Sequence, residues 1–139
     1  MRILGLDVGE KTIGVAVSDG LGFTAQGVAT IKRQSYAKDF GALKGYIDEY
    51  EATEIVAGLP KSMDGSIGPQ AEKVLLFVER LKRETGLPVT PFDERLTTAL
   101  VQKALIEGDA SRRKRKEVVD MLAAQVILQG YLDRRSTGR

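Results

Sequence analysis

The chain has 139 residues and a formal net charge of +2, and it contains no histidine, cysteine or tryptophan. Without these residues it has no imidazole base, thiol nucleophile, disulfide or thiolate zinc site. Acid–base or metal chemistry must therefore use carboxylates, Lys, Tyr, bound water or hard cations held by oxygen. The length predicts one domain over residues 1–139 with a core of its own.

The charge is unevenly distributed along the chain. Residues 1–102 hold 12 basic and 14 acidic side chains, whereas residues 103–139 hold 9 basic and 5 acidic ones. A polyanion is therefore expected to bind near the C-terminal end. Neither a signal peptide nor a run of about 18 apolar residues is recognisable, so a soluble, cytoplasmic protein is expected.

The first third of the sequence predicts strands, and the rest predicts alternating helices and strands. Short apolar runs closed by glycine-rich turns indicate strands at Arg2–Val8, Ile13–Val17 and Ala25–Ile31. Further along, helical spacing predicts helices at Tyr36–Glu51, Gln70–Glu84, Thr97–Glu107 and Glu117–Leu132. Short apolar runs between them predict strands at Glu54–Leu59 and Val89–Phe92. This order is typical of an α/β fold in which helices flank a mixed sheet.

Asp7 interrupts an otherwise apolar strand just before a turn. An ionised carboxylate is costly to bury without a partner, so its position needs an explanation. One explanation is structural, in which Asp7 accepts backbone N–H bonds of the turn. The other is that Asp7 is a metal ligand at a strand end.

Asp93 and Glu94 follow the short strand at Val89–Phe92 and precede a predicted helix. Acidic side chains near a helix N-terminus are favoured by the helix dipole, which gives a structural alternative. Thr97 or Thr98 is the expected N-cap of that helix. The two carboxylates then have no capping role and become candidate ligands.

Asp120 lies in a helix that is apolar nearly all round, which predicts burial against the sheet. It shares a helical face with Ala124, Ile127 and Tyr131, and the small Ala123 and Ala124 allow a close approach. A salt bridge to Lys116 is the structural alternative. Carboxylates from a first strand, a later strand end and a final helix converge only on folding, and such oxygen ligands suit Mg²⁺ or Mn²⁺.

Two further segments are candidates for phosphate contacts. The loop from Leu59 to Pro69 joins a strand to a helix N-terminus, where backbone N–H groups can bind phosphate, although an ordinary turn-rich loop is the simpler interpretation. Five consecutive basic residues, Arg112–Lys116, precede the Asp120 helix and suit either a solvated loop or a nucleic-acid backbone contact. The predicted nucleic-acid-binding residues are Lys11, Lys61, Arg95, Arg112, Arg113, Lys114, Arg115 and Lys116.

Five motifs, in order along the chain, resemble the YqgF family, also called RuvX or Holliday junction resolvase-like. They are the segments at residues 6–19, 58–60, 63–66, 93–98 and 120–124, with the sequences LDVGEKTIGVAVSD, GLP, MDGS, DERLTT and DMLAA. The resemblance implies a ribonuclease H-like fold with three antiparallel strands followed by two parallel ones. It also implies a metal-dependent nuclease that matures the 5′ end of pre-16S ribosomal RNA.

Carried over from the family, the catalytic and metal-binding residues are Asp7, Glu94 and Asp120, with Asp93 in reserve. In related resolvases an acidic residue ends the fourth strand, where this chain has Gly58-Leu59-Pro60. Many family members also have Lys-Arg in the first turn, where this chain has Lys11 and Thr12. This departure removes a guanidinium that would contact phosphate.

Three other functions remain compatible with the sequence. Resolution of four-way DNA junctions requires two active sites and therefore a homodimer, whereas the RNA nuclease can be a monomer. An ATP-binding phosphotransferase is suggested by the turn at residues 7–12, but such enzymes need two domains of this kind. A non-catalytic RNA-binding factor in ribosome assembly would retain the fold without turnover.

Overall fold

The computed structural model describes residues 2–98 and 112–137, which form a five-stranded mixed sheet with helices on both faces. The strand order is β3-β2-β1-β4-β5. Neighbouring strands are antiparallel from β1 to β3 and parallel from β1 through β4 to β5. The α/β class, and the sheet of three antiparallel strands followed by two parallel ones, are therefore confirmed.

The strands and first two helices lie within a few residues of their predicted positions. The strands are β1 (Arg2–Val8), β2 (Thr12–Ser18), β3 (Ala25–Lys32), β4 (Ala52–Leu59) and β5 (Val89–Asp93). The helices α1 (Tyr36–Tyr50) and α2 (Pro69–Thr85) end at residues with left-handed backbone, Glu51 and Gly86. Pro69 occupies the first turn of α2, where its missing N–H costs no hydrogen bond.

The last helix and the segment before it differ from the prediction. Helix α4 runs from Arg112 to Thr137, so the basic residues expected before the helix form its first turns instead. A short 3-10 turn, η1 (Glu94–Leu96), follows β5, and Thr97 and Thr98 are not helical. The expectation that Asp93 has no capping role is wrong: Asp93 caps η1, since its side chain accepts a hydrogen bond from the backbone N of Arg95. The rest of the predicted helix Thr97–Glu107 lies outside the described residues.

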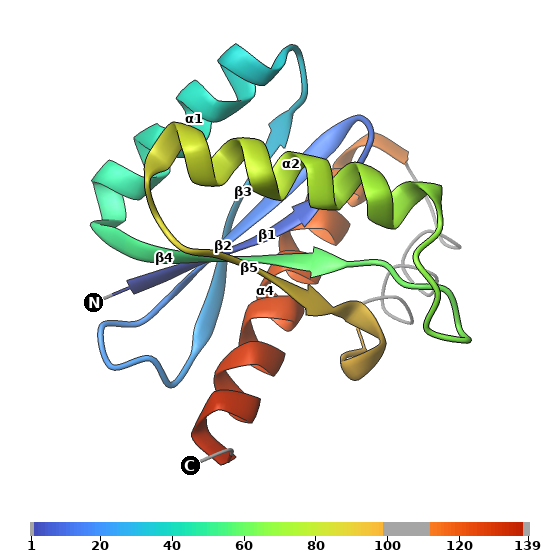
Figure 1. Ribbon diagram of the computed structural model, residues 1–139. Helices are drawn as coiled ribbons and strands as arrows, with labels where there is room; N and C mark the ends of the chain where they lie inside the picture. The colour runs from blue at the N-terminus through green and yellow to red at the C-terminus, as the bar shows by residue number, and fades with distance from the viewer. Residues whose placement is uncertain (1, 99–111, 138–139) are drawn as a thin grey trace.

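Each face of the sheet has its own apolar core. Helices α1 and α2 cover one face and α4 covers the other (Figure 1). Side chains alternate along β1, so Leu4 and Leu6 belong to the core beneath α1 and α2, whereas Ile3 belongs to the core beneath α4. None of the helices in the described part of the chain is long and apolar enough to cross a bilayer.

Helix α4 lies unusually close to the sheet because glycines face it. A Cβ atom on Gly14 would lie 1.9 Å from the backbone O of Asp120, and one on Gly5 would lie 2.6 Å from Cβ of Leu128. Real Cβ atoms essentially never approach other atoms so closely. Ala123 and Ala124 are also buried at this contact, as expected from their small size.

The turn between β1 and β2 is held from the other side by a partly buried ion pair. The Arg33 guanidinium lies 3.2 Å from Asp39, and its second nitrogen donates to the Gly9 carbonyl at 2.9 Å. The backbone N of Arg33 donates to the Lys11 carbonyl at 2.8 Å. Asp39 is only 2% exposed, so its charge depends on these donors and on the backbone N of Gln34.

Replacement of Gly14 by Ala should destabilise the protein by about 3 kcal/mol or more, because α4 must move away from β2. Gly45→Ala is the matched control, since a Cβ at this position in α1 meets no atom within 4 Å. It should stabilise the helix by up to about 1 kcal/mol. Urea unfolding of the two variants measures both effects, and equal stability of Gly14→Ala and wild type would contradict the close contact.

Candidate active site

Asp7 and Asp120 are brought together across the glycine contact. Asp7 follows Gly5 by two residues, and residues two apart in a strand lie on the same face. Asp7 therefore lies on the α4 face of β1, and it is 6% exposed. Its antiparallel partner on β2 is Gly14, and the backbone of Asp120 packs on Gly14. Asp120 itself is 8% exposed. Two buried carboxylates from distant parts of the sequence therefore occupy the same region of this face.

Glu94 reaches the same face by lying over β4. A Cβ atom on Gly58 would lie 3.0 Å from both Cγ and Oε1 of Glu94. The parallel register pairs Leu6 with Ala57, so the next residues along the two strands are Asp7 and Gly58. The Glu94 carboxylate, in a residue only 2% exposed, thus occupies the space above Gly58 beside the Asp7 strand. A larger side chain at residue 58 would displace it.

Asp93 lies on the opposite side of β5 and has other partners. It pairs in register with Leu59, which belongs to the core beneath α1 and α2. Two nitrogens of the Arg95 guanidinium contact the carboxylate, the shorter contact being 2.7 Å. This pairing, helped by the nearby charge of Lys61, holds the pKa of Asp93 below its usual range. The two adjacent acids therefore differ in face and in surroundings.

Thr12 contacts Asp120 directly. The Thr12 hydroxyl donates a short hydrogen bond to Oδ2 of Asp120. In the sequence, Thr12 was noted only because many family members have an arginine at this position. Its bond to Asp120 could not be predicted, because the two residues are 108 positions apart. In the structure its hydroxyl orients one oxygen of a candidate metal ligand. Gly58 was also missed, although a glycine within a strand often marks a close approach.

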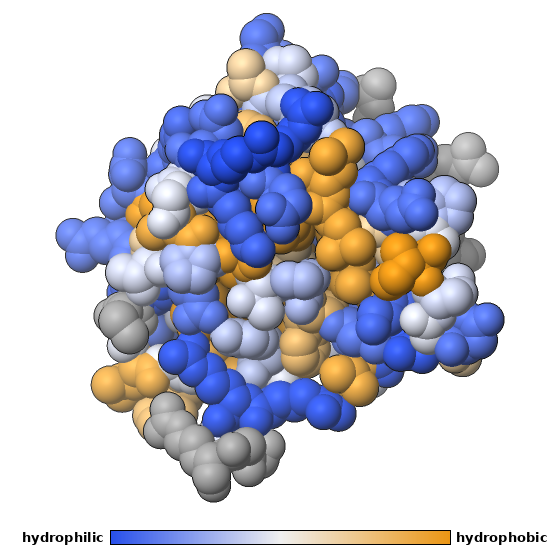
Figure 2. Space-filling model, viewed as in Figure 1, coloured by the Kyte–Doolittle hydropathy of each residue, from blue (hydrophilic) through white to orange (hydrophobic). Residues whose placement is uncertain are grey.

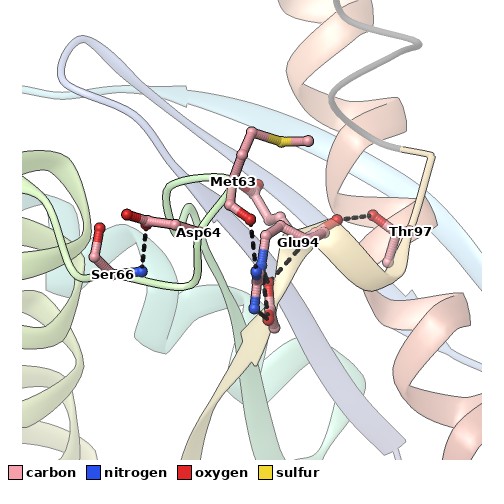
Figure 3. A network of polar contacts seen from close by, with 7 residues as sticks. Met63, Asp64, Ser66, Glu94 and Thr97 are labelled. Atoms are coloured by element: carbon pink, nitrogen blue, oxygen red, sulfur yellow. Dashed lines mark hydrogen bonds and ion pairs between the residues drawn. The ribbon is translucent and has the colours of Figure 1, made fainter.

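The loop between β4 and α2 is tied to the end of β5. Arg95 donates to the carbonyl of Met63 at 3.3 Å, and backbone bonds close the loop between Ser62, Gly65 and Ser66. Figure 3 shows this network beside Glu94 and Thr97, with the Asp64 carboxylate accepting from the backbone of Ser66. The turn-rich character expected of this loop is therefore observed.

The basic residues predicted to bind nucleic acid occupy different settings. Lys11 is exposed in the turn after β1, and Lys61 is partly exposed at the start of the loop after β4. The Arg95 guanidinium is engaged with Asp93 and Met63. Arg112–Lys116 form the first turns of α4, on the chain just before Asp120.

The donor set suits a hard divalent cation in its chemistry. Asp7, Glu94 and Asp120 offer carboxylate oxygens from one face of the sheet, and each residue is less than a tenth exposed. Such a concentration of buried acidic groups is costly unless cations or hydrogen bonds offset it. Within residues 2–98 and 112–137, no three carboxylates are already arranged around one point that a metal ion could occupy.

The fold defines a structural class, the ribonuclease H-like α/β fold that is also found in resolvases. Among solved structures, the chain is similar to RuvC of Thermus thermophilus in complex with a Holliday junction substrate, with a TM-score of 0.58 and 17% identity over 98% of this chain and 96% of that one. The fowlpox virus Holliday junction resolvase gives a TM-score of 0.50 and 14% identity over 99% of both chains. These likenesses concern the fold.

Sequence comparison identifies the family. Residues 1–134 match the RuvX family, described as Holliday junction resolvase, and the chain belongs to this family. Relatives from Clostridioides difficile and Moorella thermoacetica are 60% and 58% identical over 132 and 134 residues, which are 95% and 96% of this chain and 94% and 96% of theirs. Both are named "Putative pre-16S rRNA nuclease". The predicted family, fold and nuclease class are thereby confirmed.

Thr12→Val should destabilise the protein by about 1.5 to 3 kcal/mol, because it removes a hydrogen bond to a charged, buried carboxylate while keeping the side-chain shape. Thr12→Ser retains the donor and should lose less than about 1 kcal/mol. Urea unfolding of both variants measures the difference. Equal loss in the two would show that the methyl group, and not the hydroxyl, matters here.

Asp93→Asn should destabilise the protein at pH 7 by about 1 kcal/mol, because it removes a bidentate ion pair that is partly exposed. The lowered pKa of Asp93 means that its carboxylate stabilises the fold above the ordinary aspartate pKa. That contribution is lost as the pH falls through the lowered pKa. The stability difference between variant and wild type should therefore shrink below about pH 4, and a difference independent of pH would contradict the role of the pair.

Proposed function

We propose that the protein is a divalent-metal-dependent nuclease in which Asp7, Glu94 and Asp120 are the catalytic carboxylates. The observation that carries this proposal is the position of the Glu94 carboxylate over Gly58. It supports a site in which a residue at the end of β5 supplies an acid between the strand of Asp7 and helix α4. Family membership and the class of fold support hydrolysis of phosphodiester bonds.

The residues divide the work according to their positions. When bound, Mg²⁺ or Mn²⁺ would activate water and stabilise the charge on the leaving oxygen. The buried carboxylates would hold the ions, and Thr12 would fix the orientation of Asp120. Asp93 serves instead to cap η1 and to anchor Arg95, so Glu94 is the preferred ligand of the pair. Since the chain has no histidine, proton transfer falls to water, Lys11 or a carboxylate.

The substrate we propose is the 5′ region of pre-16S ribosomal RNA, processed in the cytoplasm. The names of the relatives from Clostridioides difficile and Moorella thermoacetica support this choice. Lys11 lies in the turn between Asp7 and Thr12, and Arg112–Lys116 lead into the helix that carries Asp120. We expect Lys11 and this basic segment to contact phosphates of the RNA backbone, so binding should weaken with salt.

Resolution of four-way DNA junctions is the second candidate, favoured by the description of the family. Symmetric cleavage of a junction requires two active sites, so this function predicts a homodimer on the substrate. Hydrolysis of one RNA strand requires a single active site, so the RNA nuclease does not depend on a second copy of the chain. The two candidates share one catalytic site and differ in substrate and assembly.

Cleavage assays with Asp7→Asn, Glu94→Gln and Asp120→Asn test the site. Each variant should cleave a pre-16S RNA 5′ fragment at least about 100-fold more slowly than wild type in Mg²⁺, because each removes a charge that would bind or position the ions. Asp48→Asn, at an exposed position on α1, is the control and should match wild type. Asp93→Asn should retain activity within about tenfold.

A four-way DNA junction run beside the RNA separates the two candidates. Faster cleavage of the junction, together with a dimer by sedimentation, would replace the RNA function with resolution. Wild-type activity in all three carboxylate variants would overturn the proposed site. Calorimetric titration with Mn²⁺ gives an independent measurement, since the same variants should bind the ion more weakly.

A further inference from the structure

Helices α1 and α2 form an open groove on the face of the molecule opposite α4. The groove has a volume of about 570 Å³. Ala37 and Gly41 are on its α1 side, and a Cβ atom on Gly41 would meet nothing within 4 Å. Its basic residues are Lys44, Arg80 and Arg83. Figure 2 shows strongly hydrophilic side chains over the part of this face where the two helices cross.

Arg80 is held in place by an aromatic ring. Its guanidinium carbon lies 4.4 Å from the ring centroid of Tyr36, within the range of a cation–π contact. The Tyr36 ring is itself packed against Phe40 and Phe77, with centroids 5.6 and 6.3 Å apart. A guanidinium stacked by one plane keeps its N–H edges available for another partner. The cation is therefore positioned before any ligand arrives.

The groove carries a surplus of positive charge. Across residues 2–98 and 112–137, neither Arg80 nor Arg83 has a carboxylate partner within 4.0 Å. Glu84, the acidic residue of the groove, lies 3.3 Å from Lys44 in an exposed pair. Two arginines thus remain for an anion, and arginine binds phosphate oxygens through paired N–H groups.

None of the large exposed apolar side chains of the described residues lies in the groove. They lie elsewhere, in the loops after β2 and β4, in η1, on α4 and at Leu76 on α2. Beside its apolar lining, the long exposed side chains of the groove are the charged Lys44, Arg80, Arg83 and Glu84. Three of these four are basic, which favours a flexible, multiply charged anion as the ligand.

We propose that this groove binds the phosphate backbone of an RNA strand, as a second contact away from the carboxylates. The choice of RNA rests on the proposed function, whereas the preference for a polyanion rests on the groove alone. Because the carboxylates lie on the α4 face, the groove contacts a flanking part of the same substrate and not the scissile bond. It would anchor a structured RNA that extends around the domain.

The test is the affinity for RNA in EDTA, where no metal-dependent cleavage can occur. Arg80→Glu/Arg83→Glu should bind a fluorescein-labelled RNA hairpin with a single-stranded 5′ tail at least about tenfold more weakly, measured by anisotropy. The slope of log Kd against log salt should fall by about 1 to 2, because about two phosphate contacts are lost. Tyr36→Leu should weaken binding about threefold, and Tyr36→Phe should restore it.

Lys38→Glu/Lys82→Glu is the matched control, with the same change of charge on the helices that form the groove, at positions outside it. It should bind within about threefold of wild type. Arg80→Gln/Arg83→Gln repeats the test if charge reversal prevents folding, as judged by thermal unfolding. Equal affinities of groove and control variants would overturn the proposal.

A labelled polyglutamate peptide distinguishes a protein ligand from RNA. If the groove variant loses the peptide while RNA affinity is unchanged, the groove is a site for acidic protein and the proposal is wrong. The binding result does not depend on catalysis. If the wild type does not cleave RNA but the groove variant binds it more weakly, the groove proposal stands and the nuclease proposal fails. If the wild type cleaves RNA but the groove variant binds it as tightly as the control, the nuclease proposal stands and the groove proposal fails.

Discussion

The close contact of α4 with β1 and β2 is the constraint on which the candidate site depends. Helices normally pack on sheets through side chains on both surfaces, but here Gly5 and Gly14 let the helix backbone approach the strands directly. The position of Asp120 is thereby set by backbone packing more than by its own side chain. Any side chain at Gly14 would push Asp120 away from Asp7. The stability of the fold and the geometry of the candidate site therefore depend on the same glycine.

A second set of contacts, on the other face, fixes the turn that carries Lys11 and Thr12. Arg33 binds the carbonyl of Gly9 and the buried Asp39, and it also lies 5.3 Å from the ring centroid of Phe77 on α2. The turn beside Asp7 is thus braced by the helix layer that forms the arginine groove. Because Asp39 is buried, loss of Arg33 would leave an uncompensated buried charge, which is strongly destabilising even where the intact pair adds little net stability. Its value here is to hold a loop in one position.

Local patterns predicted the fold well, whereas side-chain partners that depend on distant parts of the chain were harder to predict. Alternation and helical spacing identified β1 to β5, α1 and α2, because each of these elements is determined mainly by its own residues. The start of α4 was misplaced, since a run of basic residues carries no clear signal for either helix or loop. The hydrogen bond of Thr12 to Asp120 has no local signature, nor does the pairing of Arg33 with Asp39. The capping role of Asp93 was missed because a 3-10 turn of three residues has no periodicity.

Gly58 explains how a site of this kind can be assembled without an acid at the end of the fourth strand. A carboxylate on that strand would occupy the space that the Glu94 side chain fills from the neighbouring strand. The glycine and the glutamate are therefore sterically coupled, since the Glu94 side chain can occupy its position at the candidate site only if residue 58 lacks a side chain. Since the chain has neither histidine nor cysteine, carboxylates are the ionised ligands that the candidate site can offer. An acid introduced at residue 58 would displace the Glu94 side chain and would therefore not add a ligand to the set.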